Sequence, residues 1–385
     1  MAHVQAKLKN VAGQPSWRLA SKSIEAFVTR TAGMLAPATF GRGKKSFQPF
    51  QVAPWHAEKW DPALPNLLKV LRGDFFCLPF GGNESKYQNE KHPPHGETAN
   101  ADWAFEGLDE NASGSTLRLS FKTRIRKGRV RKELSVRPGQ NVIYSRHVVS
   151  GMRGPMNFGH HATLRFPSSG GLISTSAFAH GQVFPGVFEA PENKGYPALK
   201  AGAMFTNIRK VPSAFGGTVD CSRYPARRGF EDLFLLASPK SSKFGWVTAV
   251  FPKERKVWFA LKDPRVLRSL LFWHSNGGRY YAPWNGRHVD VLGLEDITGY
   301  FHYGIKESVS PNPLSKKGLH TSVKMNPKKP LVVNYIMGVA DVPAGFGRVK
   351  TLMPAKDRQS ILLTDEKGRR TTASVDVDFL YQVPK

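Results

Sequence analysis

The amino-acid sequence predicts an all-β protein built mainly from antiparallel strands. Short segments rich in β-branched and aromatic residues recur along the 385 residues and alternate with turn residues. The 36 glycines and 28 prolines interrupt the chain too often for long helices. No internal repeat, coiled coil or low-complexity linker divides the chain, so residues 1–385 are expected to form one continuous domain.

The first quarter of the chain is expected to hold a hairpin, a loop and a buried strand. Residues 16–40 contain two strand-like pieces and a glycine that leads into a third. Residues 49–65 carry four prolines, which are too many for the interior of a sheet, so this segment is predicted to be an irregular loop. Residues 75–78 form a compact apolar strand, and the glycine-rich turn at 79–82 follows it.

Residues 117–149 predict a strongly basic antiparallel hairpin. Apolar and polar residues alternate at 117–122, and six arginines and lysines surround the turn at Gly128. The polar face of such a sheet is exposed to solvent. Because almost no aromatic residues are interleaved on this face, a solvated basic surface is favoured, and contact with a polyanion is the second interpretation.

The second half of the chain continues the β pattern. Residues 263–270 are the exception, since Asp followed by Pro predicts either a short helix or a turn. The remaining predicted strands are 142–149, 162–166, 172–178, 203–208, 234–237, 245–251, 257–261, 289–295, 331–339, 360–364 and 374–381.

Composition limits the class of protein. No run of eighteen apolar residues predicts a membrane span, and the N-terminus lacks the apolar segment of a secretory signal, so a cytoplasmic location is expected. Cys77 and Cys221 form neither a disulfide framework nor a metal-binding pattern, although a disulfide between them stays possible. The formal net charge of +27 would attract polyanions or a phosphorylated substrate, or reflects a generally basic surface.

The stretch 271–304 has the strongest features of a site. Trp273, Tyr280, Tyr281 and Trp284 place four aromatic faces within twelve residues, between glycines and a proline that break regular structure. A short apolar strand then ends in Glu295. A carboxylate that leaves an apolar strand beside aromatic faces suits a base with a raised pKa. The alternative from these residues alone is a buried strand whose end meets solvent.

The phrase Leu292-Gly293-Leu294-Glu295-Asp296 resembles the segment that carries the catalytic glutamate of the galactose mutarotase (aldose 1-epimerase) family. Two upstream histidine motifs are similar to those of the same family. His95-Gly96, followed by Trp103, resembles the first motif, and His160-His161 before a strand resembles the second. The family pattern often has Asn where His160 stands, so the choice between His160 and His161 stays open.

The resemblance implies a large antiparallel β-sandwich of the mutarotase type and an epimerase that interconverts the α and β anomers of a hexose or related sugar. It assigns Glu295 as the base, His161 as the acid and His95 as a ligand of the sugar oxygens, without cofactor or metal. His160 is the alternative acid. Many mutarotases have a substrate-binding arginine near the position where this chain has Asn83 and Glu84. Arg72, Asn83 and Trp103 are therefore expected at the wall of the cleft.

Two other functions stay open at this stage. The same fold could bind a carbohydrate, including an acidic glycan, without turning it over. The basic hairpin could instead bind a polyanion. His92 and His95 could also be metal ligands, but no matching carboxylate or cysteine spacing follows them, so a metal site is not expected.

Overall fold

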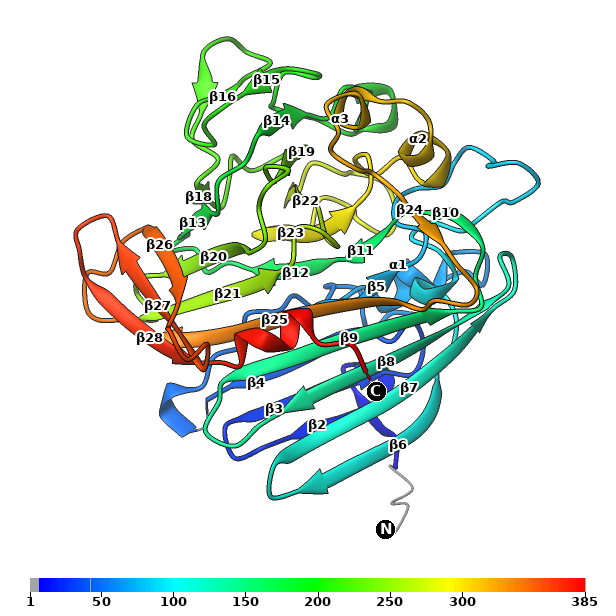
Figure 1. The fold of residues 1–385 in the computed structure, drawn as a ribbon. Helices are drawn as coiled ribbons and strands as arrows, with labels where there is room; N and C mark the ends of the chain where they lie inside the picture. Colours follow the sequence, from blue (N-terminus) through cyan, green and yellow to red (C-terminus); the bar gives the residue numbers. More distant parts are fainter. Residues whose placement is uncertain (1–6, 42, 385) are drawn as a thin grey trace.

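The computed structural model describes residues 7–41 and 43–384, and strands dominate it (Figure 1). Residues 1–6 lie outside the described residues. They belong to the N-terminal segment that lacks the apolar pattern of a secretory signal. All paired strands of the described residues run antiparallel, apart from two isolated parallel bridges. The predicted all-β sandwich is confirmed. Within the described residues, no helix is long and apolar enough to span a membrane.

Two large sheets form the body of the molecule. The larger one crosses the lower part of Figure 1. Its nine strands lie in the order β18 (Arg223–Tyr224), β13 (Gly171–Thr175), β20 (Gly245–Phe251), β21 (Lys256–Lys262), β25 (Leu331–Asp341), β9 (Val142–Ser150), β8 (Gly128–Val136), β7 (Gly114–Thr123) and β6 (Ala104–Asn111).

The second sheet carries the stretch that the sequence singled out. Its path runs β15 (Met204–Phe205), β14 (His180–Val183), β19 (Phe230–Ala237), β22 (Ser269–Asn276), β23 (Val291–Thr298), β11 (Phe158–His160) and β5 (Phe76–Cys77), and β12 (Ala162–Arg165) also pairs with β23. Strand β23 is buried along its whole length, because both faces of the sheet are covered at this point.

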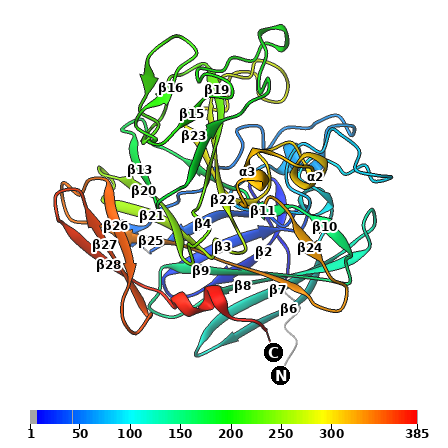
Figure 2. The same cartoon turned by 45° about the horizontal axis from the view of Figure 1, so that its top comes forward.

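Smaller sheets and short helices complete the fold. Figure 2 shows α2 and α3 beside the β10–β24 ribbon, and β26–β28 at the opposite side of the molecule. The smaller sheets are β1 (Lys9–Val11), β2 (Gln14–Ala20), β3 (Ile24–Thr29) and β4 (Leu35–Phe40); β26 (Val349–Pro354), β27 (Ser360–Asp365) and β28 (Arg370–Ser374); β10 (Gly154–Met156) with β24 (Val323–Met325); and β16 (Val211–Pro212) with β17 (Thr218–Val219). The helices are α1 (Asn66–Val70), α2 (Ile305–Val309), α3 (Pro313–Lys316), η1 (Gly43–Lys45), η2 (Glu97–Ala99), η3 (Pro191–Asn193) and η4 (Val377–Tyr381).

Three hydrophobic clusters hold these layers together. The largest includes inward-facing residues of β2–β4, of the large sheet and of the second sheet. A second cluster packs the proline-rich loop and α1 against β22 and the segment after β23. Because this cluster fixes the position of α1, whose Leu67 lines the candidate site described below, it also fixes one wall of that site.

The structure differs from one prediction of local structure and decides between the alternatives of another. Of the predicted strand 374–381, only Ser374 belongs to a strand, as the last residue of β28. Residues 377–381 form the 3-10 helix η4 instead. The apolar residues of η4 are spaced so that Phe379 packs on Tyr144 of β9, with ring centroids 5.0 Å apart. Of the two alternatives predicted for residues 263–270, the structure has the turn, in which the carbonyl of Asp263 accepts hydrogen bonds from the amides of Val266 and Leu267.

Candidate active site

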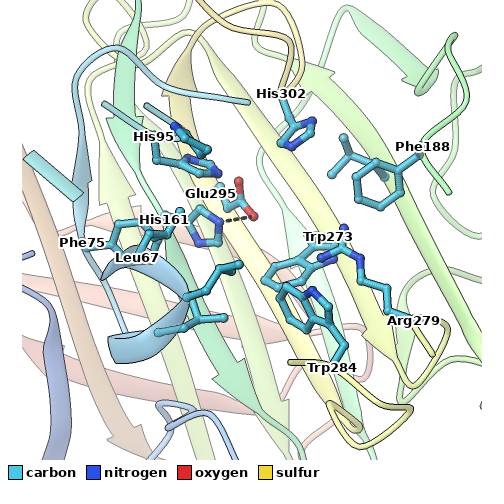
Figure 3. Close-up of a pocket in the computed structure, with 14 residues that line it drawn as sticks. Leu67, Phe75, His95, His161, Phe188, Trp273, Arg279, Trp284, Glu295 and His302 are labelled. Atoms are coloured by element: carbon cyan, nitrogen blue, oxygen red, sulfur yellow. Dashed lines mark ion pairs between the residues drawn. The ribbon is translucent and has the colours of Figure 1, made fainter. Parts of the chain in front are cut away.

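A pocket of about 620 Å³, including its open mouth, lies against the second sheet, beside β22 and β23 (Figure 3). The lining is mostly apolar and aromatic, with a few polar groups that converge on the centre. Those polar groups are His95, His161, Arg279, Glu295 and His302.

Strand β23 delivers Glu295 to the pocket. Successive side chains of a strand point to opposite faces, so Glu295 and its neighbour Asp296 separate. Asp296 lies between the two large sheets, where Lys262 Nζ is 2.5 Å from its Oδ1 and the Tyr335 hydroxyl donates to its Oδ2 at 2.9 Å. Glu295 lines the pocket and is only 2% exposed. Gly293 makes room for it, because a Cβ at Gly293 would lie 2.5 Å from Glu295 Oε1.

His161 is the direct partner of Glu295. It lies between β11 and β12, and its Nε2 is 3.3 Å from Glu295 Oε1. Its Nδ1 is 3.2 Å from the Thr163 hydroxyl, and its ring stacks on Phe75 with centroids 4.5 Å apart. The imidazole is therefore held on both a face and an edge, with one nitrogen directed at the carboxylate.

Burial changes the proton affinities of this pair. It raises the pKa of Glu295 well above the ordinary value, although the Arg279 charge acts in the opposite direction. Burial also lowers the pKa of His161 to about 3, and the neighbouring His302 adds to this effect. At a pH between the two pKa values the pair holds one proton in total, which is what one acid and one base require. Burial favours the form in which both groups are neutral.

His95 and His302 complete the polar side of the pocket. His95 has a left-handed backbone (φ 57°), and its amide donates to the Gly81 carbonyl at 2.7 Å. The next residue, Gly96, also has positive φ, and a Cβ there would lie 2.0 Å from the Leu78 carbonyl oxygen. The centroid of the His95 ring lies 5.0 Å from that of the His161 ring and 6.1 Å from that of the His302 ring. Burial lowers the pKa of both, that of His302 to about 4, so neutral imidazoles face the pocket.

The opposite wall is aromatic and holds one arginine. Trp273 and Trp284 meet edge to face, with ring centroids 5.8 Å apart, and the Arg279 guanidinium lies 4.5 Å from the Trp284 ring centre. Arg279 is ion-paired with Glu189, and its Nε is 3.9 Å from Glu231. Figure 3 shows this wall facing His161 and His95 across the pocket, with Phe188 beside it. The cation is thus already balanced by carboxylates, which makes the wall close to neutral.

Four residues that the sequence predicted for the site lie elsewhere in the structure. His160 follows the alternation of the strand to the other face, where its Nδ1 lies 2.9 Å from Asp74 and its ring stacks on Tyr335. Arg72 is fully buried and donates to the carbonyls of Val70, Val11 and Ala12. It therefore does not line the pocket.

Asn83 and Trp103 also serve the fold rather than the cleft wall. The Asn83 side-chain amide donates to the Gly81 carbonyl at 2.9 Å, and its oxygen accepts from the amide of Ile305 at 3.1 Å. This ties the glycine-rich turn to the segment after β23. Trp103 is 2% exposed, and its indole donates to the Thr98 carbonyl within the main core.

The structure adds residues that the sequence patterns did not single out. Arg279, His302 and Phe188 line the pocket, but they lie on irregular segments where no periodicity marks them. Trp273 and Trp284 were marked by the aromatic clustering, and both line the pocket. Within residues 7–41 and 43–384, no group of three or more His, Cys, Asp or Glu side chains is arranged to hold a metal ion.

The fold is that of the galactose mutarotase-like proteins, and comparison with solved structures shows this. A galactose mutarotase-like protein from Clostridium acetobutylicum has a TM-score of 0.59 and 11% identity, over 88% of this chain and 99% of that one. A candidate aldose 1-epimerase from Escherichia coli K12 has a TM-score of 0.58 and 12% identity, over 86% and 100%. A galactose mutarotase related enzyme from Lactobacillus acidophilus has a TM-score of 0.54 and 12% identity, over 85% and 99%. No protein-family model and no curated protein sequence matches the chain.

Proposed function

We propose that this chain is an aldose 1-epimerase-like enzyme that interconverts the α and β anomers of a hexose or related sugar. One observation carries the proposal: His161 Nε2 and Glu295 Oε1 are 3.3 Å apart inside a pocket whose other walls are aromatic and histidine side chains. Such a pair suits a reaction in which one proton leaves and another arrives at neighbouring atoms. The solved structures of similar fold include proteins whose names refer to this activity.

The chemistry of the hemiacetal explains why the two groups should be adjacent. Its hydroxyl oxygen and its ring oxygen are bonded to the same carbon. Glu295 takes the proton of the hydroxyl while His161 gives a proton to the ring oxygen, and the bond between the anomeric carbon and the ring oxygen breaks. The aldehyde then rotates, and the reverse transfers close the ring in the other configuration. Only protons move, and the pair returns to its starting state.

The protonation of the pair fits this cycle. Glu295 as base and His161 as acid need one proton between them, on the imidazole. Burial favours that proton on the carboxyl group instead, so sugar binding has to favour the ionised form. Hydroxyl donors of the sugar that reach the carboxylate supply this preference. His95 and His302, as neutral imidazoles, can accept or donate hydrogen bonds to other sugar oxygens.

The aromatic wall has a separate part. The C–H faces of a pyranose ring are apolar, and the indoles of Trp273 and Trp284 give a flat apolar surface for them. Glu231 fixes the first indole, because its Oε2 accepts a hydrogen bond from Trp273 Nε1 at 2.9 Å. The sugar would then be held between this wall and the acid–base pair, which places the reacting oxygens within reach.

Exchange spectroscopy tests the proposal. Magnetisation transfer between the α and β anomeric protons of glucose, galactose and mannose should accelerate in the presence of the wild-type protein. Glu295→Gln should reduce the rate by about 10²–10⁴-fold, because the amide keeps the shape and loses the base. Glu133→Gln, a partly buried strand glutamate outside the pocket, is the matched control and should keep the rate.

The same experiment separates catalysis from binding. A protein that binds these sugars but accelerates exchange of none would be a carbohydrate-binding protein, and the enzyme proposal would be wrong. Wild-type exchange that survives in Glu295→Gln would remove this carboxylate from the mechanism.

A further inference from the structure

A second hollow adjoins the mouth of the candidate active site. We name it the tyrosine hollow; its volume is about 1,030 Å³, including the open solvent above it. Phe188 lines both spaces, and Figure 3 shows this ring beside Arg279 at the edge of the catalytic pocket. The residues of the hollow used below are Glu84, Glu189, Glu192, Lys194, Tyr280 and Tyr281.

A polar bridge joins the two spaces. Arg279 lines the catalytic pocket, and its ion-pair partner Glu189 lines the tyrosine hollow. The Tyr281 hydroxyl donates to Glu189 Oε2 at 3.2 Å. A ligand that fills the first pocket and extends past Phe188 therefore meets the other side of the same ion pair.

The segments that line the hollow are hydrogen-bonded to each other. The segment before Tyr280 is joined by backbone hydrogen bonds to the segment that follows η3: the amide of Tyr280 donates to Lys194 O at 3.1 Å, and that of Tyr196 to Gly278 O at 3.1 Å. Gly195 permits the close packing, because a Cβ there would lie 2.4 Å from Glu189 Oε2.

The side chains that line the hollow are suited to bind a sugar ring. Tyr280 is 48% exposed and Tyr281 37%, although most large aromatic side chains of the described chain are buried. Exposed tyrosines offer a flat apolar face together with a polar tip. Glu84 and Glu192 are exposed carboxylates at the same hollow and can accept hydrogen bonds from hydroxyl groups, and Lys194 can donate one.

The charge of the hollow selects against acidic ligands. Glu189 is balanced by Arg279, which leaves Glu84 and Glu192 against Lys194. Among the residues that line the hollow, carboxylates thus outnumber cations, although the whole chain has a formal charge of +27. A carboxylate or sulfate on the ligand would meet like charge here.

We infer that the tyrosine hollow binds the second sugar unit of a neutral glycan whose reducing end occupies the catalytic pocket. The inference rests on the proposed function, because the reducing end is placed by the acid–base pair. The reducing unit enters the pocket, and the next unit stacks on the tyrosines.

Paired ligands test the inference in the full-length protein. Dissociation constants are measured by NMR titration for glucose against cellobiose and for galactose against β-1,4-galactobiose. In at least one pair the disaccharide should bind about tenfold more tightly. Tyr280→Ala should remove that advantage and leave the monosaccharide constant and its anomer exchange unchanged, and Glu192→Gln should reduce the advantage. Phe215→Ala, which removes an exposed aromatic outside the hollow, is the matched control.

The outcomes separate the two proposals. Disaccharides that bind no more tightly than their monosaccharides, or that bind equally well to Tyr280→Ala, overturn the inference even if monosaccharide exchange is fast. Absence of all exchange overturns the proposed function instead, and with it the placement of the reducing end. Cellobiose oxidised to a uronic acid at its non-reducing unit should bind more weakly than cellobiose, and tighter binding would contradict the charge argument.

Discussion

The free energy of unfolding should depend on pH through Glu231, because this residue is a buried carboxyl group in the wall of the site. It lies on β19 with no exposed surface, and it accepts hydrogen bonds from Trp273 Nε1 and the Ser275 hydroxyl, each at 2.9 Å. Burial raises its pKa from 4.5 to about 7, although Arg279 and these donors act in the opposite direction. The folded protein therefore binds this proton more tightly than the unfolded chain does.

The size of the effect follows from the two pKa values. The stabilisation is fully present below about pH 4.5, falls as the pH rises, and is lost above about pH 7. Each pKa unit corresponds to about 1.4 kcal/mol, so the wild-type protein should lose about 3 kcal/mol from this group across the range. Glu231→Gln cannot ionise and should not show this loss.

Urea denaturation, followed by tryptophan fluorescence, measures the difference between the two proteins. Other titrating groups, Glu295 included, are present in both and cancel in the difference. The free energy of unfolding of Glu231→Gln relative to wild type should rise by about 3 kcal/mol between about pH 4.5 and pH 8. A relative stability that stays constant with pH would refute the assignment of a raised pKa to this carboxyl group.

Three further predictions concern the acid–base pair and its surroundings. Gly293→Ala would place a Cβ 2.5 Å from Glu295 Oε1, so the carboxylate must move; anomer exchange measured by NMR should fall about 10²-fold, and an unchanged rate would show that its position is not critical. His160→Asn should destabilise the protein by about 1–3 kcal/mol in urea titrations, because Asp74 loses its buried partner, while a large loss of exchange rate would contradict its placement outside the pocket. Exchange followed by polarimetry should show no inflection near pH 6.5, because burial lowers the pKa of His161 to about 3; a rate that halves near pH 6.5 would point to an ordinary histidine.

The strands and the place of Glu295 on one of them follow from the sequence for a simple reason. Alternation and β-rich composition reflect the pleat itself, so most strands appear close to their predicted ranges. The motif around Glu295 lies on such a strand, where a single register decides which face each side chain takes. The strand prediction for segment 374–381 is wrong because its apolar composition also fits a 3-10 helix that packs on β9.

The rest of the site depends on contacts between distant segments. His160 and His161 are neighbours, so they point to opposite faces, and only the pairing of β11 and β12 with β23 decides which one reaches the pocket. Arg72 and Asn83 have the side chains expected of ligands, but nearby backbone carbonyls use their donors. Arg279, His302 and Phe188 reach the pocket from irregular segments, whose paths no local pattern predicts.

If Glu295 and His161 act as one unit on one proton, a double-mutant cycle will reveal their coupling. Anomer exchange is measured for wild type, Glu295→Gln, His161→Asn and the double variant. Each single change should reduce the rate by about 10²–10⁴-fold, and the double variant should be no slower than the slower single variant, because either loss disables the pair. Losses that multiply in the double variant would show that the two groups act independently, and a single variant that keeps its rate would remove that residue from the mechanism.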